Sequence, residues 1–494
     1  MAVNKVKGES LDILFCNCKL LLKNCLDLQP AETDTIAMRN IARTISEIKA
    51  FRNDILNRRR DIPLIRRSLA DVKRVAIINS SSRSGSSLMY ALLRRLPQVY
   101  ALTGEATPFY KLNTCLDCFN SQESDRIPTE RIDDVIDFAG ISRDFFSDLF
   151  LAETEAETGQ IDCDAYFDDL MLRISLQWTD VAFDPMTLRG CISQTFERYS
   201  AEDRHFSTED FFLLLLERLS VIWPQINPFY YDIGTDKVAL HFPYLEIPSG
   251  PPNSSFNIEE PPFILLPPRR RPILNDLSDK TLLLKSTVDC YRMNLLERIF
   301  PNADIRIIHL VRNPAAAING IYDGWHHRGF FSHNLERCFE GRGLDRLRIK
   351  GYSDIYPFGA TWWNFDLPIG WQSVADRDLV EVCAFQWHSA NSEILENLAH
   401  GRRRYCRIHY EDIIRSAVSR RGAFERLLDF IGVPIEQAEG LGLGAPPVVQ
   451  STMSPQLYRW KKREDMIAKV LDAPWIRDMA ESFNYRAEKM EDWL

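Results

Sequence analysis

Short apolar runs alternate with amphipathic stretches along most of this chain of 494 residues. Aliphatic and β-branched runs with few polar interruptions are typical of strands buried on both faces of a parallel sheet. Four such runs predict strands: Val75–Ile78, Leu282–Lys285, Ile305–Val311 and Tyr405–His409. Stretches that favour helices follow them, at residues 88–93, 290–300, 314–318 and 424–431. This alternation predicts an α/β fold with a central, mainly parallel sheet and flanking helices.

Three segments differ from this alternation and suggest how the chain is organised. Residues 1–72 are charged and have helical periodicity, so they predict a helical N-terminal extension to a domain spanning 73–494. Residues 110–275 are acidic and aromatic and predict a large insertion that forms an acceptor pocket or a lid. Within it, residues 248–272 contain eight prolines and predict an extended linker or surface lid, with Arg269–Arg271 in an exposed turn.

Composition and charge indicate which classes of partner and which cellular compartment to expect. A net charge of −9 lacks the basic footprint of a nucleic-acid or anionic-membrane binder, so we expect neither partner. The chain has no run of 18 apolar residues, so we expect no membrane span. The N-terminus does not match the pattern of a signal peptide. Eleven irregularly spaced cysteines indicate reduced thiols in the cytoplasm, and the lone CxxC of Cys115 and Cys118 predicts no metal site. Oligomeric state has no sequence signal.

A loop rich in serine, residues 80–87, separates the first predicted strand from the first predicted helix. Such a turn directs backbone N–H groups and the positive end of a helix dipole at one point, which suits a phosphate. Gly85 permits close approach of the backbone, Ser84, Ser86 and Ser87 add hydroxyl donors, and Arg83 adds a full charge. We call residues 80–87 the anion loop.

The anion loop departs from the Walker A pattern, because no lysine follows Gly85 and no glycine stands four residues before it. The order Arg83-Ser84-Gly85-Ser86-Ser87 instead resembles the 5′-phosphosulfate loop of sulfotransferases that use 3′-phosphoadenosine 5′-phosphosulfate. Tyrosylprotein and many bacterial members of that family are similar in carrying arginine before the serine. The resemblance implies a P-loop-like sulfotransferase fold and no required metal.

Three later segments resemble the same family in the same order. They are Leu284-Lys285-Ser286, the 3′-phosphate motif ending at Arg312-Asn313-Pro314, and the strand that ends in Tyr410-Glu411-Asp412. The resemblance implies that Arg83 and Lys285 face the leaving phosphate, that Arg312 holds the 3′-phosphate and that Tyr410 packs on the adenine. Arg459, in a late basic segment, is implied to close over the nucleotide. Gly320 stands where the family usually has a serine that contacts the 3′-phosphate, so Asn319 or a backbone N–H is expected in its place.

A general base must remove the proton of the acceptor. Glu105 is our candidate, because the segment Thr103-Gly104-Glu105 resembles the acidic base that follows glycine in tyrosylprotein sulfotransferases. Phenol-type members use a histidine, which keeps four histidines as alternatives: His241, His326, His327 and His333.

Together these patterns predict transfer of a sulfuryl group from 3′-phosphoadenosine 5′-phosphosulfate to a hydroxyl or amine of a small-molecule acceptor. A P-loop kinase and a nucleotide-binding module without turnover are the alternatives. The absence of the Walker lysine disfavours the kinase. A candidate base, Glu105, together with the cations Lys285 and Arg83 disfavours a module without turnover.

Overall fold

The computed structural model describes residues 32–494 apart from 115–123, 128, 152–160, 202–204, 328, 340–343, 400–402, 437–440, 442–446, 448, 450–455, 487–489 and 492. The cysteines Cys115 and Cys118 lie outside the described residues. The six cysteines that are described are free thiols.

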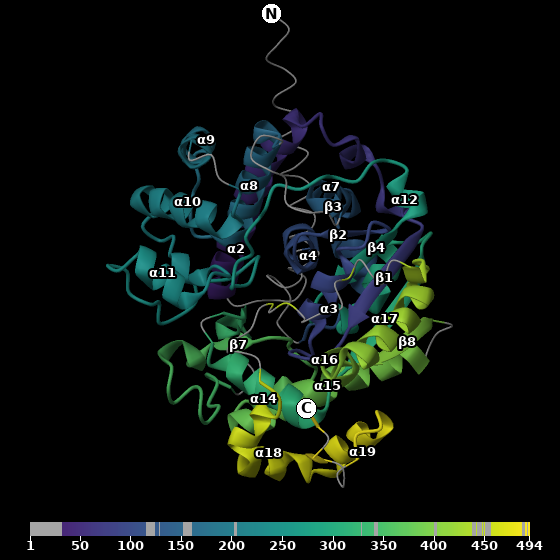
Figure 1. The fold of residues 1–494 in the computed structure, drawn as a ribbon. Coiled ribbons are helices and arrows are strands. Elements are labelled where there is room, and N and C mark those ends of the chain that lie inside the picture. Colours follow the sequence, from purple (N-terminus) through teal and green to yellow (C-terminus); the bar gives the residue numbers. More distant parts are fainter. Residues whose placement is uncertain are drawn as a thin grey trace, which may run out of the picture.

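A six-stranded sheet forms the centre of the molecule, in the order β3-β2-β4-β1-β5-β8 (Figure 1). Five strands run parallel to their neighbours, and β3 pairs antiparallel with β2 at one edge. The strands are β1 (Arg74–Asn79), β2 (Val99–Leu102), β3 (Leu149–Leu151), β4 (Thr281–Lys285), β5 (Asp304–Val311) and β8 (Arg404–His409). All four predicted strands are therefore confirmed, and so is the mainly parallel α/β sheet.

The central strands are buried on both faces, as their uninterrupted apolar runs predict. In β1, Val75 and Ile77 belong to the hydrophobic core on one face, and Ala76 and Ile78 belong to the core on the other. The first face is covered by α2 (Glu32–Arg58), α4 (Thr107–Thr114), α7 (Phe138–Asp148) and α13 (Met293–Ile299). The second is covered by α3 (Ser86–Leu93) and α17 (Ala417–Ile431).

Helices α8 (Cys163–Gln177), α9 (Pro185–Ser200), α10 (Thr208–Ile222) and α11 (Thr235–His241) form a separate group beside the sheet (Figure 1). They build an aromatic core of their own, to which Phe167, Phe211 and Trp178 contribute. No strand from residues 152–275 joins the sheet in the described part of the chain, whereas β3, also inside the predicted insertion, does.

A third group of helices lies at the bottom of Figure 1 and comprises α14 (Pro314–Trp325), α15 (Leu379–Ala399), α18 (Glu464–Leu471) and α19 (Pro474–Ser482). Near them, β6 (Phe331–Asn334) and β7 (Trp362–Asn364) form a two-stranded antiparallel sheet. Short helices complete this part: α16 (Tyr410–Ile414), the 3-10 turn η6 (Asp289–Tyr291), η8 (Pro357–Ala360) and η11 (Arg459–Arg463). No helix in the described residues is both long enough and apolar enough to cross a membrane.

The prediction of an exposed surface linker at 248–272 is wrong, because much of this segment is buried. Phe263 is fully buried, and its backbone N–H and C=O bond to Tyr230 and Asp232 of the helical group. The N–H of Leu151 in β3 donates to the C=O of Arg270. Arg271 pairs with Asp169 on α8 instead of facing solvent. The prolines suggested an unattached segment, but its aromatic side chains and bonded carbonyls make it a buried strap between the helical group and the sheet.

Candidate active site

The residues predicted from the sequence come together at the carboxyl edge of the parallel sheet. Open α/β sheets bind ligands at this edge, where strand ends and helix N-termini meet. Each of the five parallel strands is followed there by a predicted residue. They are Arg83 after β1, Glu105 after β2, Lys285 at the end of β4, Arg312 after β5 and Tyr410 after β8.

The anion loop opens α3 as predicted. Gly85 is the N-cap residue and has a φ of 94°, a left-handed conformation that glycine adopts without steric cost. Ser84 is fully buried, and its hydroxyl shares a hydrogen bond of 2.7 Å with that of Ser81. Ser86 and Ser87 are the first two residues of α3. The N-terminal end of the α3 dipole therefore lies at the loop, where it favours an anion.

Arg83 lies among other cations. Arg312 Nη1 donates to the backbone carbonyl of Arg83 at 2.9 Å, so the Arg312 guanidinium lies against the anion loop. Burial and the positive charges of Arg312 and Arg459 lower the pKa of Arg83 to about 10. The guanidinium lies over the Phe330 ring, 5.2 Å from its centroid. Three arginines that repel one another suit a ligand with more than one negative charge.

Arg459 and Arg463, both in η11, share one carboxylate. Asp323 on α14 lies 3.0 Å from Arg459 Nη2 and 2.8 Å from Arg463 Nη2. Asn319, one turn earlier, accepts from Arg463 Nη1 at 2.7 Å. The amide oxygen expected to help with a 3′-phosphate thus already faces an arginine. Arg463 belongs to the late basic segment at 459–463, but the sequence did not single it out as a site residue. Asp323 lies outside that segment and had no sequence signal.

Tyr410 packs against the anion loop. A Cβ atom built on Gly85 would lie 2.1 Å from Tyr410 Cε2, so only glycine allows this contact. The Arg312 guanidinium lies 4.7 Å from the centroid of the same ring. The next residue, Glu411, accepts from the backbone N–H of Asn313 at 3.0 Å and from its amide at 2.7 Å. Glu411 therefore ties the end of β8 to Asn313, the N-cap residue of α14, next to Arg312.

Glu105 and Lys285 form an ion pair across the edge of the sheet. The Lys285 side chain is 7% exposed and that of Glu105 is 32% exposed, so the carboxylate is the member that solutes can reach. Nearby, Asp289 in η6 is fully buried, and within the described chain its carboxylate oxygens have no hydrogen-bond partner. Burial and the charge of Glu105 raise the pKa of Asp289 to about 7. Sequence reading gave no reason to select Asp289.

A further buried carboxylate holds the anion loop from below. Asp366 accepts from the Ser82 hydroxyl at 2.9 Å and from the Tyr291 hydroxyl at 2.7 Å. Burial raises its pKa to about 7. Asp366 follows β7 in a segment that resembles none of the motifs, so its place beside the loop could not be predicted.

The four alternative histidines lie in different surroundings. His241 ends α11 in the helical group, 3.8 Å from Glu217. His326 shares a hydrogen bond with the Tyr356 hydroxyl, and the ring of His327 is 5.6 Å from that of Phe330. His333 is buried, 3.4 Å from Asp125. None of these four contacts includes Lys285, which pairs with Glu105. In the part of the chain that the structure describes, no group of three or more His, Cys, Asp or Glu residues could hold a metal ion.

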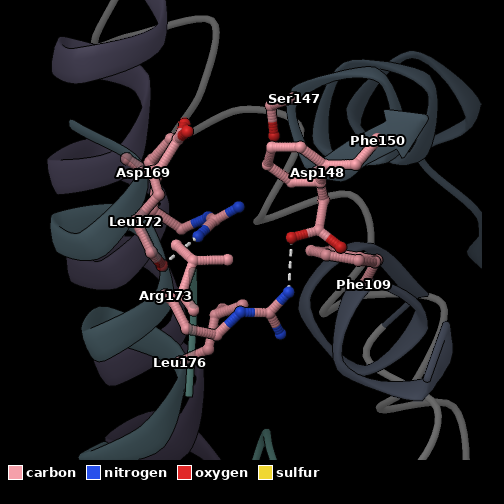
Figure 2. Close-up of a pocket in the computed structure, with 10 residues that line it drawn as sticks. Phe109, Ser147, Asp148, Phe150, Asp169, Leu172, Arg173 and Leu176 are labelled. Atoms are coloured by element: carbon pink, nitrogen blue, oxygen red, sulfur yellow. Dashed lines mark hydrogen bonds and ion pairs between the residues drawn. The ribbon is translucent and has the colours of Figure 1, made fainter. Parts of the chain in front are cut away.

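A small hollow of about 10 Å³ lies between α8 and the junction of α7 with β3 (Figure 2). Its charged side chains are all in ion pairs, and Arg173 pairs with Asp148 across it. Asp148 also accepts from the backbone N–H of Thr103 at 2.9 Å. Phe109, Phe150 and Leu172 supply apolar walls. The hollow is thus amphipathic, is formed mostly by residues 110–275, and is connected to the loop that carries Glu105.

Comparison with known proteins gives matches only among solved structures. No family model matches the chain, and no match is found among curated proteins. A sulfotransferase domain from the curacin biosynthetic pathway is 13% identical, with 84% of this chain and 99% of that domain covered and a TM-score of 0.33. A sulfotransferase from Mycobacterium avium is 15% identical, with 92% and 91% covered and a TM-score of 0.31. A sulfotransferase domain of the Synechococcus PCC 7002 olefin synthase is 16% identical, with 84% and 96% covered and a TM-score of 0.29. Because identities and TM-scores are this low, function is inferred from the residues of the site.

Proposed function

We propose that this chain is a sulfotransferase that moves a sulfuryl group from 3′-phosphoadenosine 5′-phosphosulfate to a hydroxyl or amine of a small-molecule acceptor. The observation that carries the proposal is the clustering of Arg83, Arg312 and Arg459 beside the anion loop, with the Glu105–Lys285 pair at the same sheet edge. A cradle with several cations suits a nucleotide with phosphates at both ends, and a carboxylate beside it suits removal of a proton.

The charges at the site support this donor. Burial and the positive charges of Arg312 and Arg459 lower the pKa of Arg83, and an anionic ligand would offset that repulsion. A 5′-phosphosulfate at the N-terminus of α3 would receive Arg83 and the loop N–H groups, and a 3′-phosphate would receive Arg312. Asn319 and Arg459 are the proposed further contacts, and Tyr410 is the proposed neighbour of the base.

The proposed reaction is an in-line displacement at sulfur. The acceptor oxygen or nitrogen forms a bond to sulfur while the bond from sulfur to the bridging oxygen of the donor breaks. Glu105 takes the proton of the acceptor. The bridging oxygen leaves on the 5′-phosphate, and Arg83 and Lys285 stabilise its negative charge. Once protonated, Glu105 no longer attracts Lys285, so proton removal frees the ammonium for the leaving phosphate.

The acceptor is proposed to approach from residues 110–275. The acidic and aromatic composition of this segment favours an acceptor with both apolar and hydrogen-bonding groups, such as an amphipathic alcohol or phenol. Incubation with labelled donor and a panel of alcohols, phenols, amines and sugars tests this. Label found only on amines, or only on compounds without an apolar part, would contradict an amphipathic alcohol or phenol.

Thermal unfolding tests the donor. Adenosine 3′,5′-bisphosphate without Mg²⁺ is expected to raise Tm by several degrees, because a ligand at 100 times its Kd adds about 2.7 kcal/mol. Arg83→Ala and Arg312→Ala should each remove that rise. Arg421→Ala, which changes an exposed arginine on α17, is the matched control and should keep it. Stabilisation by ATP with Mg²⁺ but not by the bisphosphate would favour the kinase alternative and overturn the proposal.

A further inference from the structure

Backbone strain is concentrated around the anion loop. Five non-glycine residues have a positive φ in the described chain: Arg83, Phe330, Phe365, Tyr458 and Asn484. This conformation costs roughly 1–2 kcal/mol per residue, so a fold retains it where the surrounding structure requires it. Four of the five lie at the site, since Tyr458 directly precedes Arg459 and the other three contact one another.

Arg83, Phe330 and Phe365 form a single stack. The Arg83 guanidinium lies 5.2 Å from the centroid of Phe330, and that ring stacks on Phe365 with centroids 4.9 Å apart and planes 28° apart. The two rings come from segments that the β6–β7 sheet joins. Phe331 pairs with Asn364, so the residues that flank this pair, Phe330 and Phe365, lie at the same end of it.

Helix α14 provides a flat face for the stack. Gly320 and Gly324 are four residues apart and therefore share one side of the helix. A Cβ atom built on Gly320 would lie 3.0 Å from Arg83 Cβ, and one on Gly324 would lie 2.2 Å from Phe365 Cζ. The glycine at 320, where the resemblance expects a serine, leaves the space that Arg83 needs.

Without such support, Arg83 would be expected to turn away from its neighbours. Arg312 and Arg459 repel its charge, and burial of the guanidinium adds to the cost. A cation over an aromatic face recovers about 0.5–2 kcal/mol, and the negative face of the ring accepts the charge without neutralising it. The Phe330 ring therefore helps to hold the guanidinium in place without neutralising its charge.

We infer that Phe330 and Phe365 are positioning residues that hold the Arg83 guanidinium toward the leaving phosphate of the donor, an inference that rests on the proposed function. Both rings act through Arg83 and need not contact the nucleotide. The aromatic face is the property that matters, so tyrosine should substitute for phenylalanine at 330, whereas leucine should not.

A double-mutant cycle on the full chain tests this inference, with the affinity for adenosine 3′,5′-bisphosphate measured by calorimetry without Mg²⁺. Phe330→Leu should weaken binding about 5- to 20-fold, the loss that corresponds to a cation–π contact. Phe330→Tyr should stay within about twofold of the parent. In an Arg83→Gln background, Phe330→Leu should have no further effect, because the charge that it positions is gone.

Phe358→Leu is the matched control. Phe358 also stacks on an aromatic ring, that of Tyr356, with centroids 5.2 Å apart and planes 18° apart, but no arginine of the described chain lies over its ring. Its substitution should leave affinity unchanged. Equal losses from Phe358→Leu and Phe330→Leu, or additive losses from Phe330→Leu and Arg83→Gln, would overturn the inference while the proposed function stands. If Arg83→Gln alone leaves affinity unchanged, the proposed function fails instead. Phe365→Leu supplies a second arm if Phe330→Leu does not fold.

Discussion

The Lys285 ammonium at the end of β4 is paired with the Glu105 carboxylate that follows β2. Strands β2 and β4 are parallel neighbours, so the pair joins two adjacent strand ends. Lys285 is nearly buried and Glu105 is partly exposed, which leaves the carboxylate as the member that can meet an acceptor. The pair places a carboxylate beside an ammonium, the combination that the proposed sulfuryl transfer requires.

Glu105→Gln should separate binding from chemistry. The amide keeps the size of the side chain but cannot take a proton, and a general base contributes about 100- to 10,000-fold to rate. We therefore expect bisphosphate affinity to stay near that of the parent while transfer to any accepted acceptor falls by that factor. Single-turnover assays with labelled donor measure the rate. Full activity in this variant would assign the base role to a histidine, with His333→Gln as the next variant to assay.

Gly320→Ser should weaken donor binding instead of restoring a missing contact. The new Cβ would lie 3.0 Å from Arg83 Cβ, so Arg83 must shift by a few tenths of an ångström. Helix propensity opposes any loss of stability, because replacing a glycine inside a helix gains several tenths of a kcal/mol. We expect roughly a 3- to 10-fold loss of bisphosphate affinity, within the range of a cation–π contact, with little change in Tm. Tighter binding would mean that the serine reaches the 3′-phosphate.

Asp323→Asn should make the protein depend more strongly on its ligand. Asp323 is nearly buried and neutralises both Arg459 and Arg463. Loss of one partner of a buried pair costs 3–5 kcal/mol, and the partial exposure of both arginines reduces this to about 2 kcal/mol. Tm without ligand should fall, and the rise on adding bisphosphate should exceed that of the parent. An equal fall with and without ligand would show that these arginines do not meet the nucleotide.

The contribution of Asp289 to stability should decline as pH rises from about 4 to 7. Burial and Glu105 raise the pKa of Asp289 to about 7, against an ordinary value of 3.8. Between these values the folded state binds more protons than the unfolded state, so each unit of pH in this window costs up to about 1.4 kcal/mol. The contribution of Asp289 is fully present below the lower pKa and is lost above the higher one.

Asp289→Asn should flatten that dependence, because the amide remains neutral at every pH. Denaturant unfolding at pH 5 and pH 8 gives the comparison. Glu105→Gln removes a charge that raises the pKa of Asp289, so it should move the decline to lower pH. Asp366 has a similarly raised pKa, but Asn there would lose an acceptor for Ser82 or Tyr291. An Asp289→Asn protein with the full parental slope would assign the dependence to other groups.

The sequence predicted the strands and the residues at their ends for a physical reason. Strands β1, β4 and β5 are buried on both faces, and such strands have few residues that could suggest another structure. The residues after them came from short motifs, and parallel pairing places all strand ends at one edge. Arg83, Lys285 and Arg312 could therefore be assigned to one site before any contact was known.

The support beneath that site could not be predicted in the same way. Phe330 and Phe365 meet Arg83 through contacts between distant segments, and a positive φ in a phenylalanine leaves no local signal. Asp366 reaches Ser82 across 284 positions in the chain. The strap at 248–272 was misjudged because its prolines suggest an exposed linker, whereas burial of Phe263 depends on helices that pack elsewhere. Gly320 stood out only as a departure from the motif that its segment resembles, and the structure explains it by the close approach of Arg83 Cβ.

The order of strands has a consequence for how the chain reaches its folded state. In the middle of the sheet, Val75 of β1 pairs with Leu282 of β4, about 200 residues later. To form such contacts the chain must first lose the entropy of closing a long loop, and the stabilising contacts form only afterwards. Folding is therefore slow. Because the site needs the ends of β1, β2, β4, β5 and β8 together, an incompletely folded chain presents no assembled anion cradle. Nucleotide binding should therefore report completion of the whole sheet, and refolding followed by ligand binding should lag behind the return of helical signal.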